Sequence, residues 1–315
     1  MTCQRVTLVH NPTAGDQQIA ADALVRAVAD AGYEVKYESS KGARLERALR
    51  RPTDLVVAAG GDGTVRKVAV LLAELGTAPL AILPIGTANN IAKSFGVLGL
   101  TRELVEWWAR SERRRIDVGL LSGRGETRMF VESVGGGIFT ELIRRGKAQI
   151  EDNVAALTGN EIDRALLVLQ RVVREARPRP WRLDLDGEDL SGNYLAVEAM
   201  NVHLIGPNVP LAASGNASDG LLDVVTIGPD DRDALLAYLE GRLRGGGTQP
   251  RFPSRKGRRL LALVDDAALH ADDERWPGDG ETAGRAKHSR SAGRSDARVE
   301  LTVRPGSLEV LLPPS

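Results

Sequence analysis

The hydrophobic pattern of the first 120 residues alternates between short apolar runs and segments with a single apolar face. Residues 6–10 and 54–59 are apolar runs of strand length, and residues 17–31 repeat their apolar positions with helical spacing. Further strands are expected at 33–37 and 80–83, and further helices at 45–50, 65–75 and 88–95. Strand and helix alternating at this pitch predict βαβ units, and therefore an α/β domain with a doubly wound parallel sheet.

After residue 113 the pattern changes to short strands separated by turns, interrupted by one amphipathic helix at 161–175. Turns are expected at Asp186-Gly187 and Pro305-Gly306. The expected strands are 115–121, 128–133, 181–186, 194–199, 223–227, 260–264, 268–271, 299–303 and 308–312. The pattern predicts a mostly antiparallel, β-rich second domain over 126–315, after a first domain over 1–125. Residues 277–297 are rich in Gly, Ser, Ala and Arg, which predicts a disordered insertion.

The strongest candidate for chemistry is the glycine-rich junction in LVVAAGGDGTVRKVAVLL, residues 55–72. A buried strand ends there, three glycines make the turn, and a helix begins at about Thr64. Glycines let a backbone approach a phosphate closely, and the amides of a new helix point at it. A tight turn without a ligand is the alternative. Asp62 between the glycines favours a nucleotide site, because open α/β sheets bind ligands at the carboxyl ends of their strands.

Two further loops follow strands at the same edge of the predicted sheet. Residues 11–15 (NPTAG) follow the first strand, and residues 84–90 (PIGTANN) follow the fourth, with Lys93 one turn into the next helix. Each loop alone is compatible with an ordinary turn. Three polar, glycine-bearing loops at one edge together predict a pocket.

Composition narrows the function classes. The chain has 315 residues, which suits two domains, and 42 basic side chains balance 42 acidic ones, which argues against a nucleic-acid binder. The single Cys3 excludes an internal disulfide. No uncharged apolar stretch approaches the ~18 residues of a membrane span, and the N-terminus shows no leader pattern. These features predict a cytoplasmic protein that would meet a lipid from the water side.

The three loops carry a family resemblance. NPTAG, GGDGTV and LPIGTANNIAKSFG, in this order, resemble the diacylglycerol kinases, sphingosine kinases and related bacterial lipid kinases. The similarity continues in RRIDVG at 114–119, ESVGGGIF at 132–139, ASDGLLDVV at 217–225 and PGSLEVLLP at 305–313. The resemblance implies an N-terminal nucleotide domain, a C-terminal β-rich domain, an active site in the cleft between them, and the use of ATP and Mg2+.

The resemblance also implies roles for individual residues. Asp62 would be catalytic, by organising the metal and the phosphates. Asp117 would join this polar network, or else be a turn aspartate at the end of a strand. Asp219 would bind magnesium with main-chain oxygens near Asn216 and Leu221, or simply make a turn. The residues implied to hold the nucleotide are Asn11, Pro12, Thr13, Ala14, Gly15, Ser39 or Ser40, Gly60, Gly61, Asp62, Gly63, Thr64, Val65 and Thr87.

The general base has three candidate segments. Asp186-Gly187-Glu188 lies in an expected hairpin, where a turn is its ordinary role. Asp279-Gly280-Glu281 matches the family's Asp-Gly-Glu in spelling but falls in the low-complexity stretch. Asp272-Asp273-Glu274 directly follows a strand, with Asp in place of Gly. A base needs fixed geometry, so we favour Asp272 and Glu274.

Three departures from the family pattern affect charge near the phosphates. Asp16 replaces a common lysine, Arg66-Lys67 replaces Asn-Glu, and Asn90 replaces an aspartate. Cations at a helix N-terminus are disfavoured by its dipole. Arg66 and Lys67 would instead compensate for the missing cation by reaching the phosphates.

Residues 241–260 contain seven Lys/Arg and no acid in an otherwise neutral chain. The segment predicts a peripheral contact with anionic lipid, at roughly 1 kcal/mol per basic residue near the headgroups. A solvated basic loop is the alternative. Trp107-Trp108 and Phe139 are interpreted as core or interface aromatics rather than lipid anchors.

The leading interpretation is an ATP- and magnesium-dependent kinase of a lipid hydroxyl, with diacylglycerol as the first candidate, acting transiently at the inner membrane surface. A NAD kinase-like or phosphofructokinase-like enzyme shares GGDG, but PIGTANN and DGLLD argue against it. A regulator that binds nucleotide or lipid without catalysis is the alternative from another class. The sequence leaves the acceptor lipid and a possible homodimer open.

Overall fold

The computed structural model describes residues 4–15, 19–42, 44–149, 160–264, 269–277 and 297–313. The chain divides into two compact units. Unit 1 comprises Met1–Val118, Ala217–Asp219 and Arg304–Ser315, and unit 2 comprises Gly119–Asn216 and Gly220–Val303. The sequence predicts one boundary near residue 125, whereas two later segments also group with unit 1. The expected insertion at 277–297 lies almost wholly outside the described residues.

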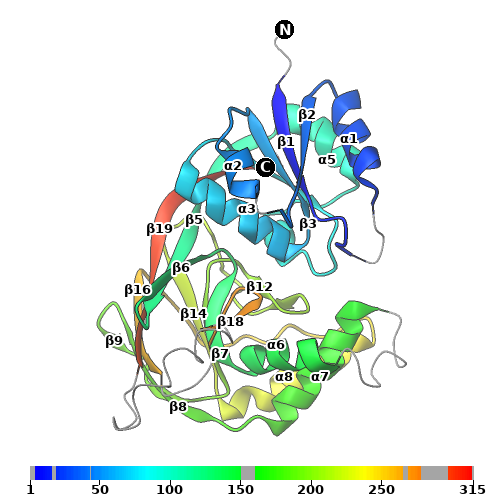
Figure 1. Ribbon diagram of the computed structural model, residues 1–315. Helices are drawn as coiled ribbons and strands as arrows, with labels where there is room; N and C mark the ends of the chain where they lie inside the picture. Colours follow the sequence, from blue (N-terminus) through cyan, green and yellow to red (C-terminus); the bar gives the residue numbers. More distant parts are fainter. Residues whose placement is uncertain are drawn as a thin grey trace. The chain divides into compact units, whose positions relative to one another are not determined.

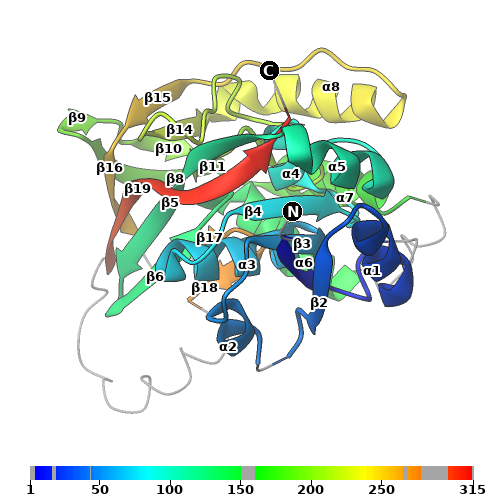
Figure 2. The same cartoon turned by 90° about the horizontal axis from the view of Figure 1, so that it is seen from above.

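Unit 1 contains the predicted parallel sheet. Its strands lie in the order β4-β3-β1-β2, and each neighbouring pair is parallel. Helices α1 and α5 pack together on one face of the sheet, and α2 and α3 lie on the other (Figures 1 and 2). The strands are β1 (Arg5–His10), β2 (Glu34–Ser39), β3 (Leu55–Gly60) and β4 (Leu80–Pro84); the helices are α1 (Ala21–Asp30), α2 (Leu45–Leu49), α3 (Asp62–Leu75), α4 (Asn90–Ser94), α5 (Thr101–Trp107) and the 3-10 turn η1 (Trp108–Arg110).

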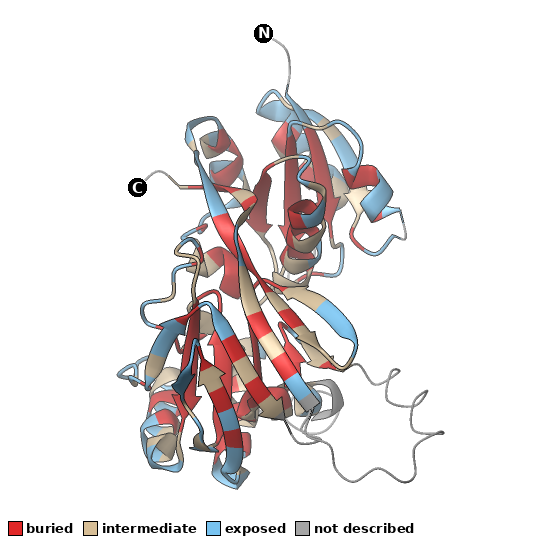
Figure 3. Ribbon diagram, turned by 90° about the vertical axis from the view of Figure 1, so that its left-hand side faces the viewer, coloured by how far each residue is buried: buried red, intermediate tan, exposed pale blue. Residues whose placement is uncertain are grey.

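Burial explains the apolar pattern of these strands. All six residues of β3 are buried, as expected for a strand with covered faces and neighbours on both sides. The edge strand β2 has no fully buried residue and consists of exposed and half-buried positions (Figure 3). The sheet therefore presents its most apolar strand at the centre, directly before the glycine-rich junction.

Unit 2 is mainly antiparallel, as predicted. One sheet has the order β15-β14-β11-β7-β17-β18, and the other contains β10-β8-β16-β19 with β9 and the β5–β6 hairpin. The first comprises β15 (Ser254–Gly257), β14 (Leu222–Ile227), β11 (Ala196–Met200), β7 (Ser133–Gly137), β17 (Leu269–Ala271) and β18 (Glu274–Trp276). The second comprises β10 (Gly192–Tyr194), β8 (Arg179–Leu185), β16 (Arg259–Val264), β19 (Ala297–Leu312), β9 (Glu188–Asp189), β5 (Glu112–Gly123) and β6 (Glu126–Phe130). Of β19 and β5, only residues 297–303 and 119–123 belong to unit 2. A separate hairpin pairs β12 (Leu204–Ile205) with β13 (Val209–Pro210).

Strand β11 shows how unit 2 builds two cores. Val197 and Ala199 lie in a core between the two sheets, together with Trp181 and Trp276. Ala196 and Met200 belong to a second core, which the six-stranded sheet shares with helices α6 (Ile138–Gln149), α7 (Glu161–Glu175) and α8 (Arg232–Leu243). Because side chains alternate along a strand, both faces of β11 are buried, and so is Glu198 on the helix side.

Several elements differ from the expectations. The second domain was expected to contain one long helix, but α6 and α8 accompany α7. Helix α6 continues without a break from the glycine-rich strand β7, so it has no strong start signal in the sequence. Helix α8 follows the short turn η2 (Pro229–Asp231), whose proline and two aspartates are a start signal that was overlooked. Helix α5, of 7 residues, was also not predicted.

Two predicted strands are each divided. Residues 128–133 belong to β6 and β7, and residues 194–199 belong to β10 and β11. The expected turn at Pro305-Gly306 is wrong: both residues lie within β19, where Gly306 has φ +56°. Among the described helices, none is long and apolar enough to cross a membrane.

Candidate functional site

Three loops of unit 1 meet backbone against backbone at the carboxyl ends of β1, β3 and β4. Gly15 has φ +69°, and a Cβ there would lie 2.4 Å from the carbonyl oxygen of Ile85. A Cβ on Gly86 would lie 2.2 Å from the Cα of Gly61. The loops approach this closely because glycine occupies the contact points. The structure therefore brings together the three loops that the sequence placed at one edge.

The β3–α3 junction has the form of a phosphate-binding turn. Helix α3 begins at Asp62, two residues earlier than expected, with Gly61 as its N-cap. The buried Thr64 folds back over Gly60, where a Cβ would lie 2.4 Å from the Thr64 Oγ1. The first amides of a helix lack intrahelical acceptors, and α3 has 14 residues behind them. This end of α3 suits an anion.

Asp62, the first residue of α3, is hydrogen-bonded to the first turn of α4. Its Oδ1 accepts a hydrogen bond from the backbone N–H of Ile91, at 2.9 Å, in the first turn of α4. Asn89 closes the preceding loop: its Nδ2 donates to the Gly86 carbonyl at 2.6 Å, and its Oδ1 accepts from the Gly86 N–H at 3.1 Å. Thr87 lies inside this closed loop, next to the glycine contact with Gly61.

The β1 loop is held by Asn11. Its backbone N–H donates to the Ala59 carbonyl at 3.0 Å, and its Oδ1 accepts from the N–H of Thr13 at 3.2 Å. The Thr13 Oγ1 in turn accepts from the ammonium of Lys41, at 2.7 Å. Sequence reasoning missed Lys41, since no motif letter marks it. Pro12 is exposed and Ala14 is buried in the same loop, and Asp16 lies outside the described residues.

Lys67 was expected to compensate charge at the phosphates. Its ammonium donates to the backbone carbonyl of Ser40 at 2.6 Å, linking α3 to the loop after β2. Ser40 is buried, and the Oγ of the neighbouring Ser39 accepts from the N–H of Lys41 at 3.3 Å. Of the two serines, only Ser40 contacts a cationic group, and Lys67 already serves a structural contact there.

Asp117 lies inside β5, so its interpretation as a strand-end turn residue is wrong. The buried carboxylate accepts from the N–H of Gly306 at 2.8 Å, and its own N–H donates to the Ala217 carbonyl at 2.6 Å. Both partners belong to the segments that return to unit 1 late in the chain. Asp117 therefore holds two distant segments in this unit.

The candidate metal residues follow one another in the loop before β14. Asp219 comes three residues after Asn216 and two before Leu221, around Gly220 at φ +72°. One carboxylate with main-chain carbonyls is a donor set that suits a hard cation. Across the described ranges, no group of three or more His, Cys, Asp or Glu side chains is arranged for a metal. A cation in this loop would therefore depend on main-chain oxygens.

The favoured base lies in the two-residue turn between β17 and β18. Asp272 is buried with φ +54°, and its Oδ1 accepts from three successive backbone N–H groups, of Val131, Glu132 and Ser133, at 3.1, 2.6 and 3.3 Å. These hydrogen bonds fix the position of the carboxylate. Glu274, on the same hairpin, forms an ion pair with Arg128 of β6. Both side chains thus have a fixed geometry.

The competing base candidates differ from this. Asp186-Gly187 is a two-residue hairpin turn with φ +53° and +92°, and the Asp186 carboxylate accepts from the backbone N–H groups of Arg258 and Arg259 at 2.7 and 3.0 Å. Its expected role as a turn is confirmed. Asp279 and Glu281 lie outside the described residues.

A buried ionisable pair in unit 2 escaped sequence reasoning. Glu198 of β11 lies 3.2 Å from the Nε2 of His270 in β17, and both side chains are fully buried. Gly135 is opposite both residues in the sheet, and a Cβ on it would lie 2.1 Å from the Glu198 carboxylate. Burial raises the pKa of Glu198, and the nearby His270 opposes this shift only in part. The only sequence feature that could have indicated this pair is the run of three glycines at 135–137, which leaves room for two large side chains on the neighbouring strands.

Ion pairs reduce the charge of the basic segment 241–260. Lys256 lies 3.3 Å from Asp223, Arg255 3.5 Å from Glu188, and Arg259 2.5 Å from Glu300. Within the described part of the chain, the exposed Arg251 and Arg258 have no ion-pair partner. The expected core role of Trp108 and Phe139 is confirmed, since both are buried.

Comparison with known proteins gives two family matches. A model described as the diacylglycerol kinase catalytic domain matches residues 5–121, and one described as the YegS C-terminal NAD kinase beta sandwich-like domain matches residues 148–312. A protein of Bacillus subtilis (strain 168) named diacylglycerol kinase is 27% identical over 255 residues, 77% of this chain and 80% of that protein.

Two further relatives agree with these matches. A Pseudomonas aeruginosa (strain UCBPP-PA14) protein named "Probable lipid kinase YegS-like" is 32% identical over 259 residues, 78% of this chain and 79% of that protein. The crystal structure of a diacylglycerol kinase from Bacillus anthracis str. Sterne has a TM-score of 0.70 at 18% identity, covering 100% of this chain and 98% of that one. The solved structure shows that the fold is shared.

Proposed function

Because this chain belongs to the family of diacylglycerol kinases and related lipid kinases, it is a phosphotransferase with a hydroxyl acceptor, and we propose that it phosphorylates diacylglycerol with ATP. Kinases of this family use ATP and usually a divalent metal, which we propose to be Mg2+. The observation that carries the proposal is the contact of three glycine loops around the start of α3, with the carboxylate of Asp62 among them.

In this proposal, unit 1 binds the nucleotide. ATP, when bound, supplies the phosphoryl group that is transferred. The amides at the start of α3 would hold its phosphates, and the close packing of Gly15, Gly61 and Gly86 leaves backbone rather than side chains at the loop contacts. Lys41 would add a positive charge beside Thr13. Catalysis of phosphoryl transfer rests mainly on such positioning and charge stabilisation.

In this proposal, Asp272 of unit 2 is the general base for the acceptor hydroxyl. Three backbone N–H groups hold its carboxylate in place, and it would accept the proton of the acceptor hydroxyl as the new oxygen–phosphorus bond forms and ADP leaves. Glu274 would remain beside it, held by Arg128. Asp219, with main-chain oxygens near Asn216 and Leu221, would bind the divalent cation, a role that the oxygen donors suit.

The test is turnover of labelled ATP with Mg2+ in mixed micelles, with diacylglycerol, other lipid alcohols and NAD as parallel acceptors. We expect labelled phosphatidic acid and no labelled NADP. Binding of ATP without turnover of any lipid would favour a regulator, and phosphorylation of NAD would favour a NAD kinase. Either result would refute the proposed function.

The base assignment has its own test. Asp272→Asn should lower turnover strongly, whereas the double substitution Asp279→Ala and Glu281→Ala should leave it unchanged. A folded Asp279/Glu281 variant without activity would move the base out of the β17–β18 hairpin.

We also propose that the enzyme works in the cytoplasm and meets its lipid at the inner membrane surface through residues 241–260. Arg251 and Arg258 carry this part of the proposal, because the acids around the segment already neutralise Arg255, Lys256 and Arg259. A salt-sensitive attraction to anionic vesicles would follow.

A further inference from the structure

Unit 2 contains a pocket of about 430 Å3 that the proposed function does not use. It lies between the start of α6, the end of α7 and the strands β8, β10 and β18. Trp181, Tyr194 and Leu195 contribute its apolar wall. Its charged lining consists of five arginines and two glutamates: Arg144, Arg145, Arg177, Arg179, Arg275, Glu141 and Glu175. The lining therefore carries a surplus of positive charge in a chain whose net charge is zero.

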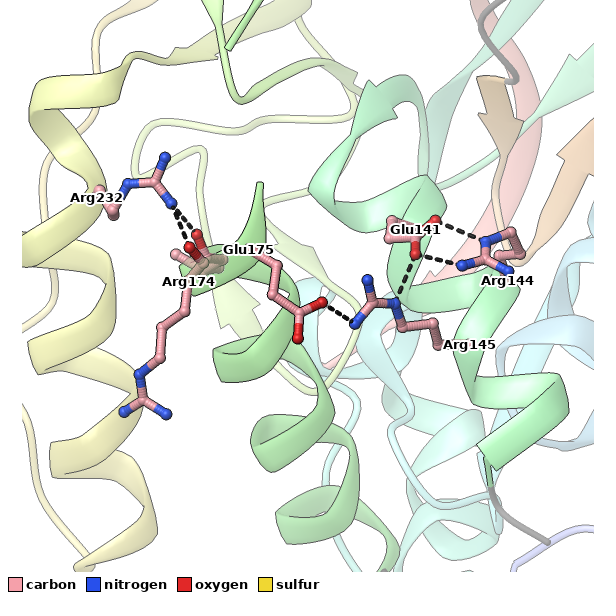
Figure 4. Close-up of polar contacts among 7 residues, drawn as sticks. Glu141, Arg144, Arg145, Arg174, Glu175 and Arg232 are labelled. Carbon is pink, nitrogen blue, oxygen red and sulfur yellow. Dashed lines mark hydrogen bonds and ion pairs between the residues drawn. The ribbon is translucent and has the colours of Figure 1, made fainter. Parts of the chain in front are cut away.

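Part of this lining is a fixed ionic framework (Figure 4). Glu141 accepts from Arg144 at 2.6 Å and from Arg145 at 2.5 Å, and Arg145 also lies 2.6 Å from Glu175. The hydrogen bond from Arg144, followed by that from Arg145, lowers the pKa of Glu141 to about 2. Glu141 is therefore ionised at neutral pH. These ion pairs hold α6 and α7 together and fix the position of two guanidinium groups.

Two of the other arginines have no such ion pair within the described residues. Arg177 and Arg179 follow the C-terminus of α7, are exposed, and have no acidic partner within the ranges that the structure describes. The negative end of the α7 dipole does not offset them fully, because Arg232 donates to the terminal carbonyls of Val173 and Ala176. Uncompensated guanidinium groups around a concave site are the usual ligands of phosphate, which they bind through paired N–H donors.

We infer that this pocket binds a phosphomonoester, either as a free small molecule or as the head group of a lipid. A dianionic phosphate matches the surplus charge of the lining, and the pocket is large enough for a glycerol phosphate. The site lies within unit 2, and its lining includes no residue of the three nucleotide loops in unit 1.

The pocket is connected to the hairpin that carries Asp272. Thr140 lines the pocket, and its hydroxyl lies 2.9 Å from the Nδ1 of His270 in β17. Arg275, another lining residue, belongs to β18. A bound phosphate would therefore contact β18 through Arg275, and it would be linked to β17 only through Thr140.

The test is a binding experiment on the full chain, with excess ADP present to occupy the nucleotide loops. Glycerol phosphate is titrated by calorimetry, and phosphatidic acid vesicles are compared with phosphatidylcholine vesicles by flotation. The test variant is Arg177→Gln/Arg179→Gln. The matched control is Arg171→Gln/Arg174→Gln, which removes the same charge from exposed positions on α7. The side chain of Arg174 points away from the ion pairs (Figure 4).

We expect binding by the wild type and the control, with at least a tenfold loss of affinity in the test variant. Binding of glycerol phosphate would identify a free ligand, and binding of phosphatidic acid vesicles alone would identify a lipid head group. Absence of both, or equal losses in the test and control variants, would overturn the inference. Neither readout depends on turnover, so failure here is distinguishable from failure of the proposed function.

Discussion

Asp62 allows its electrostatic role to be separated from its structural one. In Asp62→Asn the side chain keeps an oxygen that can accept the 2.9 Å hydrogen bond from Ile91, but it loses the charge. In Asp62→Ala both the acceptor and the charge are lost. The two variants should therefore differ in stability and agree in activity.

The magnitudes follow from these contacts. Loss of an acidic charge in the first turn of α3 costs about 0.3–1 kcal/mol. Removal of the Ile91 acceptor leaves a part-buried N–H unsatisfied, at about 1–3 kcal/mol. We expect Asp62→Asn to lie within about 1 kcal/mol of the wild type and Asp62→Ala to be about 2–3 kcal/mol less stable. If the carboxylate organises the phosphates, both should lose a factor of at least about 10²–10³ in turnover.

Unfolding in urea and ATP turnover, measured on the same preparations, check this prediction. Asp22→Asn is the matched control. It makes the same chemical change, from carboxylate to amide, in the first turn of another helix, α1, and Asp22 belongs to none of the three loops. Near-normal turnover in Asp62→Asn would show that the charge has no catalytic role. A stability loss in Asp62→Asn as large as in Asp62→Ala would show that the bond to Ile91 depends on the charge.

Three further predictions test unit 2. The pKa of Glu198 is higher in the folded than in the unfolded chain, so its contribution to stability is full below pH about 4.3 and declines as the pH rises toward the folded pKa. Melts of Glu198→Gln from pH 4 to 8 should lack this decline, and a wild-type-like profile would contradict the assignment. Asp272→Asn should lower turnover by at least about 10² with unchanged nucleotide affinity; weaker nucleotide binding would contradict a role as base. Arg251→Gln/Arg258→Gln should weaken binding to phosphatidylglycerol vesicles at low salt and match the wild type at high salt; equal binding at low salt would identify a solvated loop.

The sequence by itself determined the features that depend on neighbouring residues. The apolar run before GGDG, the glycines at the turn and the helical spacing after it specify a strand, a tight turn and a helix within 20 or so positions. The βαβ arrangement of unit 1 and the placing of three loops at one edge followed from that local pattern. The turn at Asp186-Gly187 was likewise predicted correctly, because a two-residue hairpin turn with positive φ at both positions favours Asp and Gly.

Only the tertiary structure decided which distant residues meet. Asp117 bonds to Gly306, 189 positions away, and Glu198 meets His270 over Gly135, because strand order and register bring them together. The hydrophobic periodicity of the sequence indicates neither of these contacts. Helix α8 was missed for a related reason, since its burial against α7 and the sheet stabilises it more than its own pattern does. Long-range packing selects among many pairings that the local sequence leaves equally possible.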